Sequence, residues 1–174
     1  MEQTYMKEQP ILNLLLKMSL PMVVSMLVNS LYNIVDSFFV AKISENAMTA
    51  LSLVFPVQNL INAVMIGFGI GINAVISFYL GAADQKKAAQ AASQGMLLGT
   101  FHGILLMIIC LVVIHPFLSL FTNDAEIINL GLRYSKIVFL FSVFFAWELV
   151  FEKVFQAVGK MNISMICLMS GCLV

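Results

Sequence analysis

The sequence predicts an all-α membrane protein: a polytopic helix bundle with four complete spans and part of a fifth. Its 174 residues are 61% hydrophobic and only 10% charged, whereas an ordinary soluble domain has about 25% charged residues. A soluble domain of this size buries only about 70% of its surface, so it needs more polar residues than this chain contains. The apolar residues are also gathered into five runs, which short polar connections separate.

The first run covers residues 18–40 and follows a polar start and a short amphipathic stretch, residues 11–17. It is long enough to cross a hydrocarbon core of about 30 Å, and it exceeds the apolar region of a cleavable signal peptide. We therefore expect this helix to stay in the mature protein as the first span.

The second run covers residues 50–80, which at about 1.5 Å per residue gives a helix of about 45 Å. This length exceeds the thickness of the hydrocarbon core, so three arrangements remain open: a tilted helix, a bend near Pro56, or a helix that protrudes. Residues 81–90 form the next polar connection.

The third run covers residues 92–114, and His115–Pro116 predicts its end, because proline cannot continue the hydrogen-bond pattern of a helix. Residues 122–124, with the sequence Thr-Asn-Asp, are typical of a turn. The third span is therefore expected to end before this turn.

The fourth span, residues 130–157, has only a short uninterrupted apolar part. It crosses the membrane only if its charged residues reach the interfaces: Arg133 and Lys136 at one end, and Glu148, Glu152 and Lys153 at the other. Glu148 and Glu152 share a helical face, which favours an interfacial charge cluster, with an interior position for Glu148 as the alternative. Residues 163–174 make about 18 Å of helix, an incomplete fifth span.

The distribution of basic residues predicts a cytoplasmic N-terminus. Basic residues favour the inner side of a membrane, and with the N-terminus inside, the inner segments hold more of them than the outer segments. The inner residues are Lys7, Lys17, Lys86, Lys87, Lys153 and Lys160, and the outer ones are Lys42, Arg133 and Lys136. We expect a multi-pass protein of the plasma membrane, the inner membrane in a bacterium.

Several classes of function are excluded by composition. The formal net charge is zero, and no basic run could follow a nucleic-acid backbone. The three cysteines lie in apolar runs without a C-x-x-C pair, so neither a disulfide framework nor a metal site is indicated. No nucleophile and base, paired catalytic carboxylates or phosphate loop is visible, so we expect neither an enzyme nor a cofactor.

One face of the first span carries its polar residues. Ser25, Asn29, Tyr32 and Asp36 follow one another at steps of four, three and four, with Asn33 beside them, and this spacing places them on one side of a helix. A charged carboxylate facing lipid costs several kcal/mol. Asp36 is therefore expected to face a protein interior or a wet cavity, and an interfacial hydrogen-bonding role near the end of the span is the alternative.

The second span adds three amides, Gln58, Asn59 and Asn62, which could either line a cavity or bridge helices. Both interpretations stay open from the sequence alone. Small residues at every fourth position let membrane helices approach closely, and this spacing predicts helix packing at Gly67 and Gly71 of the second span and at Ala91, Gly95, Gly99 and Gly103 of the third.

Short motifs in order along nearly the whole chain resemble those of one transporter family, the multidrug and toxic compound extrusion (MATE) family. The motifs are Ser19–Leu20–Pro21, residues 31–40 (LYNIVDSFFV), Ala50–Leu51–Ser52, Pro56, the glycine segment 67–71, the hinge Gly81–Ala82 with its lysines, and residues 156–160 (QAVGK).

The resemblance implies a cation-coupled antiporter built from two six-helix lobes. Such proteins export amphipathic, often cationic compounds in exchange for protons or sodium. Asp36 matches the acid that binds the coupling cation, and Pro21 matches a proline that lets the first helix bend. We assign Asn33 to the cation site with Asp36, because sodium requires several oxygens. Possible cavity-lining residues are Asn29, Tyr32, Gln58 and Asn62.

The resemblance also implies that residues 1–174 form most of one N-terminal lobe, because family members are longer and their fifth helix continues into a segment that completes the cation site. The expected partners are small amphipathic or cationic substrates, the lipid bilayer and the C-terminal part of the same transporter. Alone, the chain is expected not to transport. Two alternatives remain: a lipid-linked sugar flippase of the same superfamily, which would favour a basic cavity, and a small non-transporting tetraspan that binds a partner.

Overall fold

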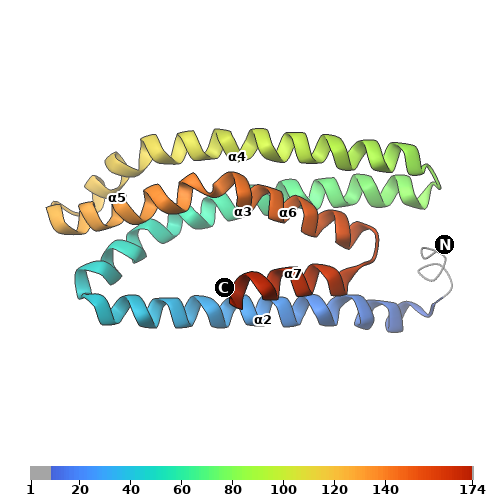
Figure 1. Ribbon diagram of the computed structural model, residues 1–174, viewed down its shortest axis with the longest axis horizontal. Coiled ribbons are helices and arrows are strands. Elements are labelled where there is room, and N and C mark those ends of the chain that lie inside the picture. The colour runs from blue at the N-terminus through green and yellow to red at the C-terminus, as the bar shows by residue number, and fades with distance from the viewer. Residues whose placement is uncertain (1–8, 174) are drawn as a thin grey trace.

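The computed structural model describes residues 9–173, with side chains described for residues 9–170, and the regular secondary structure of this part of the chain is all α-helix. Figure 1 shows long helices that run side by side along one axis. Their bounds are α2 (Ile11–Ile43), α3 (Glu45–Gly81), α4 (Gln85–Phe121), α5 (Ala125–Leu140), α6 (Ser142–Ala157) and α7 (Met161–Leu173).

Three polar side chains begin the helices that follow the tight connections. The hydroxyl of Ser44 accepts from the backbone N–H of Ala47 at 3.0 Å before α3, and a carboxylate oxygen of Asp84 accepts from that of Lys87 at 3.0 Å before α4. Asp124 caps α5 in the same way. Such caps satisfy backbone donors that the first turn of a helix leaves free, and the Lys87 contact lowers the pKa of the Asp84 carboxyl.

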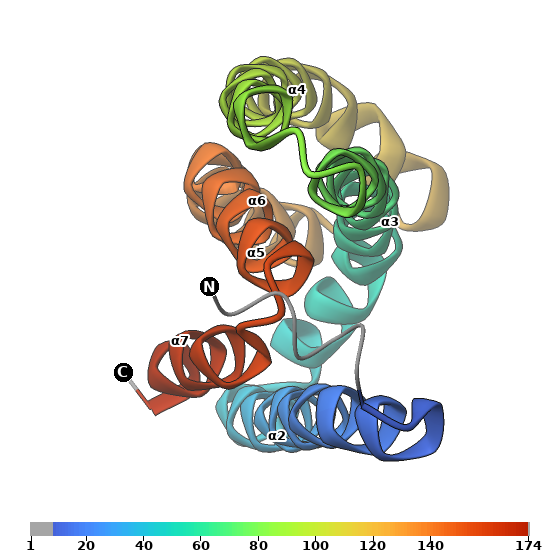
Figure 2. The same cartoon turned by 90° about the vertical axis from the view of Figure 1, so that its right-hand side faces the viewer.

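The helices form a tightly packed core and a looser second part. The core lies between α3, α4 and the consecutive helices α5 and α6, and its fully buried side chains include Val54, Ile114, Leu118 and Phe139. Helices α2 and α7 pack on each other and lie apart from α4 (Figure 2). We call these two helices the α2–α7 pair. In α2 only Pro21 and Ser25 are buried.

The glycines of α4 bring the core helices into close contact. A Cβ atom at Gly95 would lie 2.8 Å from Ile72 of α3, and one at Gly99 would lie 2.7 Å from Val150 of α6. The predicted packing role is confirmed there, but it is wrong for Gly67 and Gly71, where an added Cβ meets nothing within 4 Å among the described residues. The glycine of α3 that makes a close contact is Gly69, which lies against the Lys153 side chain.

The expected fourth span, residues 130–157, is divided into two helices of 16 residues each, α5 and α6, which meet at Phe141. The hydroxyl of Ser142 donates to the carbonyl of Phe139 at 2.7 Å, and a hydroxyl that bonds the preceding turn bends a helix. At the same point α4 approaches so closely that a Cβ at Gly103 would lie 3.1 Å from the Cα of Val143. By length and composition, three helices qualify as membrane spans among the described residues: α2, α3 and α4.

Helix α4 continues through Pro116 to Phe121, so the end expected at His115–Pro116 is wrong. Proline is tolerated inside membrane helices where other groups satisfy the freed backbone, and Ser119 donates to the carbonyl of His115 at 3.0 Å in this turn. The turn at residues 122–124 is where the helix ends. The other helices also extend past their apolar runs, because polar residues can continue a helix beyond the hydrocarbon core.

Candidate functional site

The polar face of α2 is turned toward the rest of the bundle. Ser25, Asn29 and Tyr32 lie along one cavity, and Asp36 lies along another. The opposite face of α2 is exposed and apolar, with Val23, Leu27, Ile34 and Phe38 on the outside of the structure. The helix therefore separates a lipid-compatible surface from a polar interior.

Most polar side chains of this face are bonded to their own helix. The amide of Asn33 donates to the backbone carbonyl of Asn29 at 2.9 Å and lies 3.0 Å from its side-chain oxygen. Ser37 donates to the carbonyl of Asn33 at 2.9 Å. Asp36 differs, because its carboxylate makes no hydrogen bond or salt bridge within the part of the chain that the structure describes. Asp36 is the charged group of this face of α2, and its carboxylate is free to bind a ligand.

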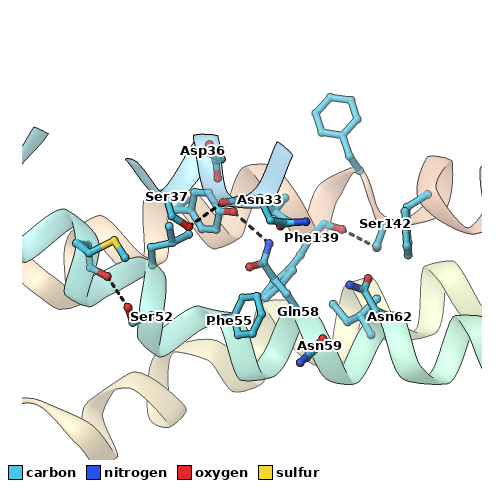
Figure 3. Close-up of a pocket in the computed structure, with 17 residues that line it drawn as sticks. Asn33, Asp36, Ser37, Ser52, Phe55, Gln58, Asn59, Asn62, Phe139 and Ser142 are labelled. Carbon is cyan, nitrogen blue, oxygen red and sulfur yellow. Dashed lines mark hydrogen bonds between the residues drawn. The ribbon is translucent and has the colours of Figure 1, made fainter. Parts of the chain in front are cut away.

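Asp36 lies at a cavity of about 560 Å³, which we call the Asp36 cavity. In Figure 3 Asn33, Asp36 and Ser37 of α2 face Gln58 of α3 across this space. The amide of Gln58 donates to the hydroxyl of Tyr134 of α5 at 3.1 Å. The remaining lining residues are mostly apolar and include Phe55, Phe139, Phe141 and Phe145.

The Asp36 cavity has a single charged lining residue. Asp36 is the only carboxylate, and neither lysine, arginine nor histidine appears among the lining residues that the structure describes. An uncompensated carboxylate in a mostly apolar space attracts cations. The same residues do not form a metal site of the usual kind, since the described part of the chain contains no group of three or more His, Cys, Asp or Glu side chains that could hold a metal ion.

A second cavity, of about 500 Å³, lies between α6 and the α2–α7 pair. We call it the Glu148 cavity after one of its lining residues. Asn33, Asn62 and Phe145 line both this cavity and the Asp36 cavity, so the two are neighbours. Together they follow the polar face of α2 from Ser25 to Ser37.

The sequence-based site residues thus divide between two places. Asp36, Asn33, Gln58 and Asn62 line the Asp36 cavity, while Asn29 and Tyr32 lie in the Glu148 cavity with Asn33 and Asn62. All three amides of α3, Asn59 included, line the Asp36 cavity, and Gln58 also bridges α3 to α5 through its hydrogen bond to Tyr134. Pro21 is buried inside a helix that continues through it, and the hydroxyl of Ser25 donates to its carbonyl at 2.9 Å.

A polar network on α6 was missed from the sequence. The ammonium of Lys153 lies 3.3 Å from a carboxylate oxygen of Glu152 and donates to the side-chain oxygen of Gln156 at 3.2 Å. The amide of Gln156 donates to the same Glu152 oxygen at 2.6 Å, and Asn73 of α3 donates to the backbone carbonyl of Lys153 at 3.0 Å. The spacing of residues 152, 153 and 156 was the available signal, but their charges suggested the interface.

The chain is similar to one protein family and to curated relatives. The family model described as MatE matches residues 21–174. The multidrug export protein MepA of Staphylococcus haemolyticus strain JCSC1435 is 30% identical over 168 residues, which are 96% of this chain and 37% of the relative. MepA of Staphylococcus aureus strain MRSA252 is 26% identical over the same length. The chain therefore spans about 37% of the length of these curated relatives.

Solved structures show the same fold. A crystal structure of a mutant MATE protein superposes with a TM-score of 0.92 at 22% identity, covering 99% of this chain and 39% of that one. A crystal structure of MATE in the straight conformation gives a TM-score of 0.85 at 26% identity and covers 91% of this chain and 35% of the other. With the family model matching most of its length, the chain belongs to the MatE family, whose members are the multidrug efflux transporters that the sequence motifs resemble.

Proposed function

We propose that the complete protein that contains residues 1–174 is a cation-coupled antiporter of the plasma membrane. It exports amphipathic, often cationic compounds in exchange for protons or sodium ions that move inward. The observation that carries this proposal is the position of Asp36, a carboxylate without a hydrogen-bond partner among the described residues, at the wall of a cavity inside a bundle of apolar helices. The relatives named multidrug export proteins support the transport of drugs.

The chemistry of the Asp36 cavity is consistent with coupling. A carboxylate in an apolar membrane interior is costly when charged and unpaired, so proton or sodium binding stabilises the loaded state. The amide groups of Asn33 and Gln58 lie along the same cavity and offer further oxygens, which sodium prefers as ligands. Loading and unloading of Asp36 then shifts the balance between two arrangements of α2, and such a shift gives alternating access.

The walls of the cavity suit amphipathic substrates. Aromatic side chains form large apolar surfaces, and the four phenylalanines of the Asp36 cavity supply such surfaces beside a few amides and one carboxylate. A sugar-phosphate lipid would need basic side chains at this place, and the lining contains none among the residues that the structure describes. The flippase alternative therefore gains no support from the Asp36 cavity, and the antiporter is the function that we propose.

Asp36→Asn in the complete transporter tests this proposal, with Glu45→Gln as the matched control because Glu45 is exposed at the start of α3, outside both cavities. Purified proteins in vesicles would export ethidium, a permanent organic cation, under an imposed proton or sodium gradient. We expect Asp36→Asn to lose ion-driven export while its insertion and folding match the wild type. Export at the wild-type rate by this variant would refute the coupling role.

A further inference from the structure

The break between α5 and α6 lies in the wall of the Asp36 cavity. Lining residues of this cavity come from both sides of the break: Tyr134, Val138, Phe139, Phe141, Ser142 and Phe145. Figure 3 shows the hydrogen bond that joins Ser142 to Phe139 at this point. The direction in which α5 leaves α6 therefore decides where these side chains lie, and with them the shape of the cavity.

A buried hydroxyl bonds the backbone at the break. Ser142 is only 4% exposed, and its hydroxyl donates to the carbonyl of Phe139 at 2.7 Å. The carbonyl of Gly103 of α4 is a second acceptor, at the longer distance of 3.4 Å. A hydroxyl has a single proton to donate, so the bond to Phe139 is the stronger one. A serine that bonds the preceding turn in this way competes with the helical hydrogen bonds of the backbone.

Both helices are held against the core on either side of the break. In α5, a Cβ atom at Gly131 would lie 2.9 Å from the side chain of Leu118 of α4. In α6, the side chain of Val150 lies 2.7 Å from the position of a Cβ atom at Gly99 of α4. Neither helix can move along α4 without losing such close packing, so the break is a fixed shape of the wall and not a moving hinge.

The position of α5 sets the orientation of one amide in the Asp36 cavity. The hydroxyl of Tyr134 of α5 accepts the hydrogen bond from the amide nitrogen of Gln58 at 3.1 Å. The side-chain oxygen of the same amide makes no hydrogen bond within the described residues. This oxygen is therefore available as a ligand for a cation such as sodium, and a shift of α5 would release the amide from its orientation.

We propose that Ser142 is a positioning residue for the coupling ion. Its hydroxyl maintains the break at Phe141, and the break keeps α5 where Tyr134 bonds Gln58. The oxygen of Gln58 is thereby held in the same cavity as Asp36, as a further ligand of the ion. This inference rests on the proposed function, and it adds a residue of α6 to a site whose ion ligands lie on α2 and α3.

The test compares two buried serines that are seven residues apart. Ser135 is fully buried, and its hydroxyl has no hydrogen-bond partner among the described residues, so Ser135→Ala is the matched control for Ser142→Ala. Ethidium export by the complete transporter in vesicles is measured over a range of sodium and proton concentrations. We expect Ser142→Ala to raise the ion concentration for half-maximal export about tenfold, which corresponds to about 1.4 kcal/mol, at a maximal rate near that of the wild type. Ser135→Ala is expected to keep both wild-type values.

A third variant, Ser142→Cys, separates the hydrogen bond from the size of the side chain. A thiol is a weaker donor than a hydroxyl, so this variant is expected to lie between the wild type and Ser142→Ala in the ion concentration that it requires. It also carries the test if the alanine variant fails to fold.

The geometry of the break is measured separately, by the distance between spin labels on Ala125→Cys and Phe151→Cys in the complete transporter with its native cysteines replaced. Both positions are exposed. An unbroken helix spans about 39 Å between residues 125 and 151, and a bend shortens this distance. We expect Ser142→Ala to lengthen the distance toward that value and Ser135→Ala to leave it unchanged.

Four outcomes would contradict the inference or its basis. An unchanged spin-label distance in Ser142→Ala would show that the hydroxyl does not maintain the break. A longer distance with an unchanged ion requirement would overturn the positioning role. A greater impairment in Ser142→Cys than in Ser142→Ala would make side-chain size the cause, which also overturns it. If the wild type exports ethidium under neither gradient, the proposed function itself fails, while the distance still reports on the break.

Discussion

At the scale of single residues, the same side-chain type has different roles because its neighbours differ. Glu152 and Glu148 are one helical turn apart on α6. Glu152 forms an ion pair with Lys153 and accepts a hydrogen bond from Gln156. Glu148 has neither an ion-pair partner nor a hydrogen-bond partner among the described residues. Asp36 on α2 resembles Glu148 in this respect. Glu148 is exposed, whereas Asp36 is partly buried. An unpaired carboxylate is costly in an apolar interior, and Asp36 is therefore the one to which we assign the coupling ion.

The ion pair on α6 leads to a prediction about stability. The side chains of Lys153 and Glu152 are only 12% and 20% exposed, so their charges are largely removed from water. We expect Lys153→Met to lower the free energy of unfolding by about 2 kcal/mol, because it leaves the carboxylate of Glu152 without its counter-ion. Methionine retains most of the side-chain stem that packs on Gly69.

The control for this prediction is the double variant Lys153→Met with Glu152→Gln, which removes both charges and leaves two amides able to bond each other. Its stability is expected to return close to the wild-type value, because replacing both members of a buried ion pair is often neutral. The thermal unfolding temperature of the complete transporter in detergent measures both effects. A double variant as unstable as the single one would show that packing at Lys153, rather than its charge, matters.

The sequence predicts which side chains share a face of one helix, but it does not predict which side chains of two helices meet. The stripe from Ser25 to Asp36 follows from helical periodicity alone, and these residues do face the interior cavities. In contrast, the hydrogen bonds from Gln58 to Tyr134 and from Asn73 to Lys153 join residues 76 and 80 positions apart. Such pairs depend on how far one helix is shifted along another, which a single sequence does not encode in its periodicity.

At the scale of helices, the three prolines that lie inside helices differ in their exposure. Pro21 is buried in α2, while Pro56 and Pro116 are exposed inside α3 and α4. All three helices continue through the proline, although sequence rules place a helix end at such a position. The rule failed at Pro116 because a membrane helix has no water to compete for its backbone, and only one hydrogen bond is lost there.

The division of the fourth span at Phe141 has a similar origin. Sequence periodicity could identify the helical residues on both sides, but the break lies where Ser142 bonds to the preceding turn and where α4 approaches closely at Gly103. The approach of another helix leaves no trace in the sequence of the fourth span itself. For the same reason the spacing of Gly67 and Gly71 matched a packing motif that the structure uses at Gly69 instead.

Helix packing at α4 leads to the next prediction. Gly95→Ala places a methyl group 2.8 Å from one carbon of Ile72 and 3.1 Å from two others, and overpacking of this kind costs about 1–3 kcal/mol. We expect a lower unfolding temperature for this variant of the complete transporter. The matched control is Gly71→Ala, where an added methyl meets no described atom within 4 Å and alanine favours a helix by about 0.5–1 kcal/mol.

The two glycine variants change the same chemical group, so the comparison isolates the close contact between α3 and α4. Gly71→Ala is expected to unfold at or above the wild-type temperature. If Gly95→Ala were as stable as Gly71→Ala, the close approach of α4 to Ile72 would not contribute to stability, and the packing role of the α4 glycines would have to be abandoned.

At the scale of the whole molecule, the bundle consists of a close-packed core and a separate pair of helices. The buried side chains lie mainly between α3, α4, α5 and α6, whereas α2 and α7 pack chiefly on each other. Three cavities of about 500 to 600 Å³ lie along the inner side of α2, and the third contains Met18, Met22 and Met26 of that helix. The loosely held helix is thus the one that carries Asp36, and a loosely packed element can move at a lower cost in free energy.

This arrangement predicts that water reaches one face of α2 and not the other. In the complete transporter with its native cysteines replaced, Asn29→Cys is expected to react with a membrane-impermeant cationic thiol reagent, because residue 29 lines the Glu148 cavity. Leu27→Cys is the matched control on the opposite, apolar face. There the thiol faces lipid and stays protonated, and a protonated thiol is a poor nucleophile. Equal labelling rates at the two positions would contradict this prediction. They would show that the two faces of α2 are either both accessible to water or both closed to it.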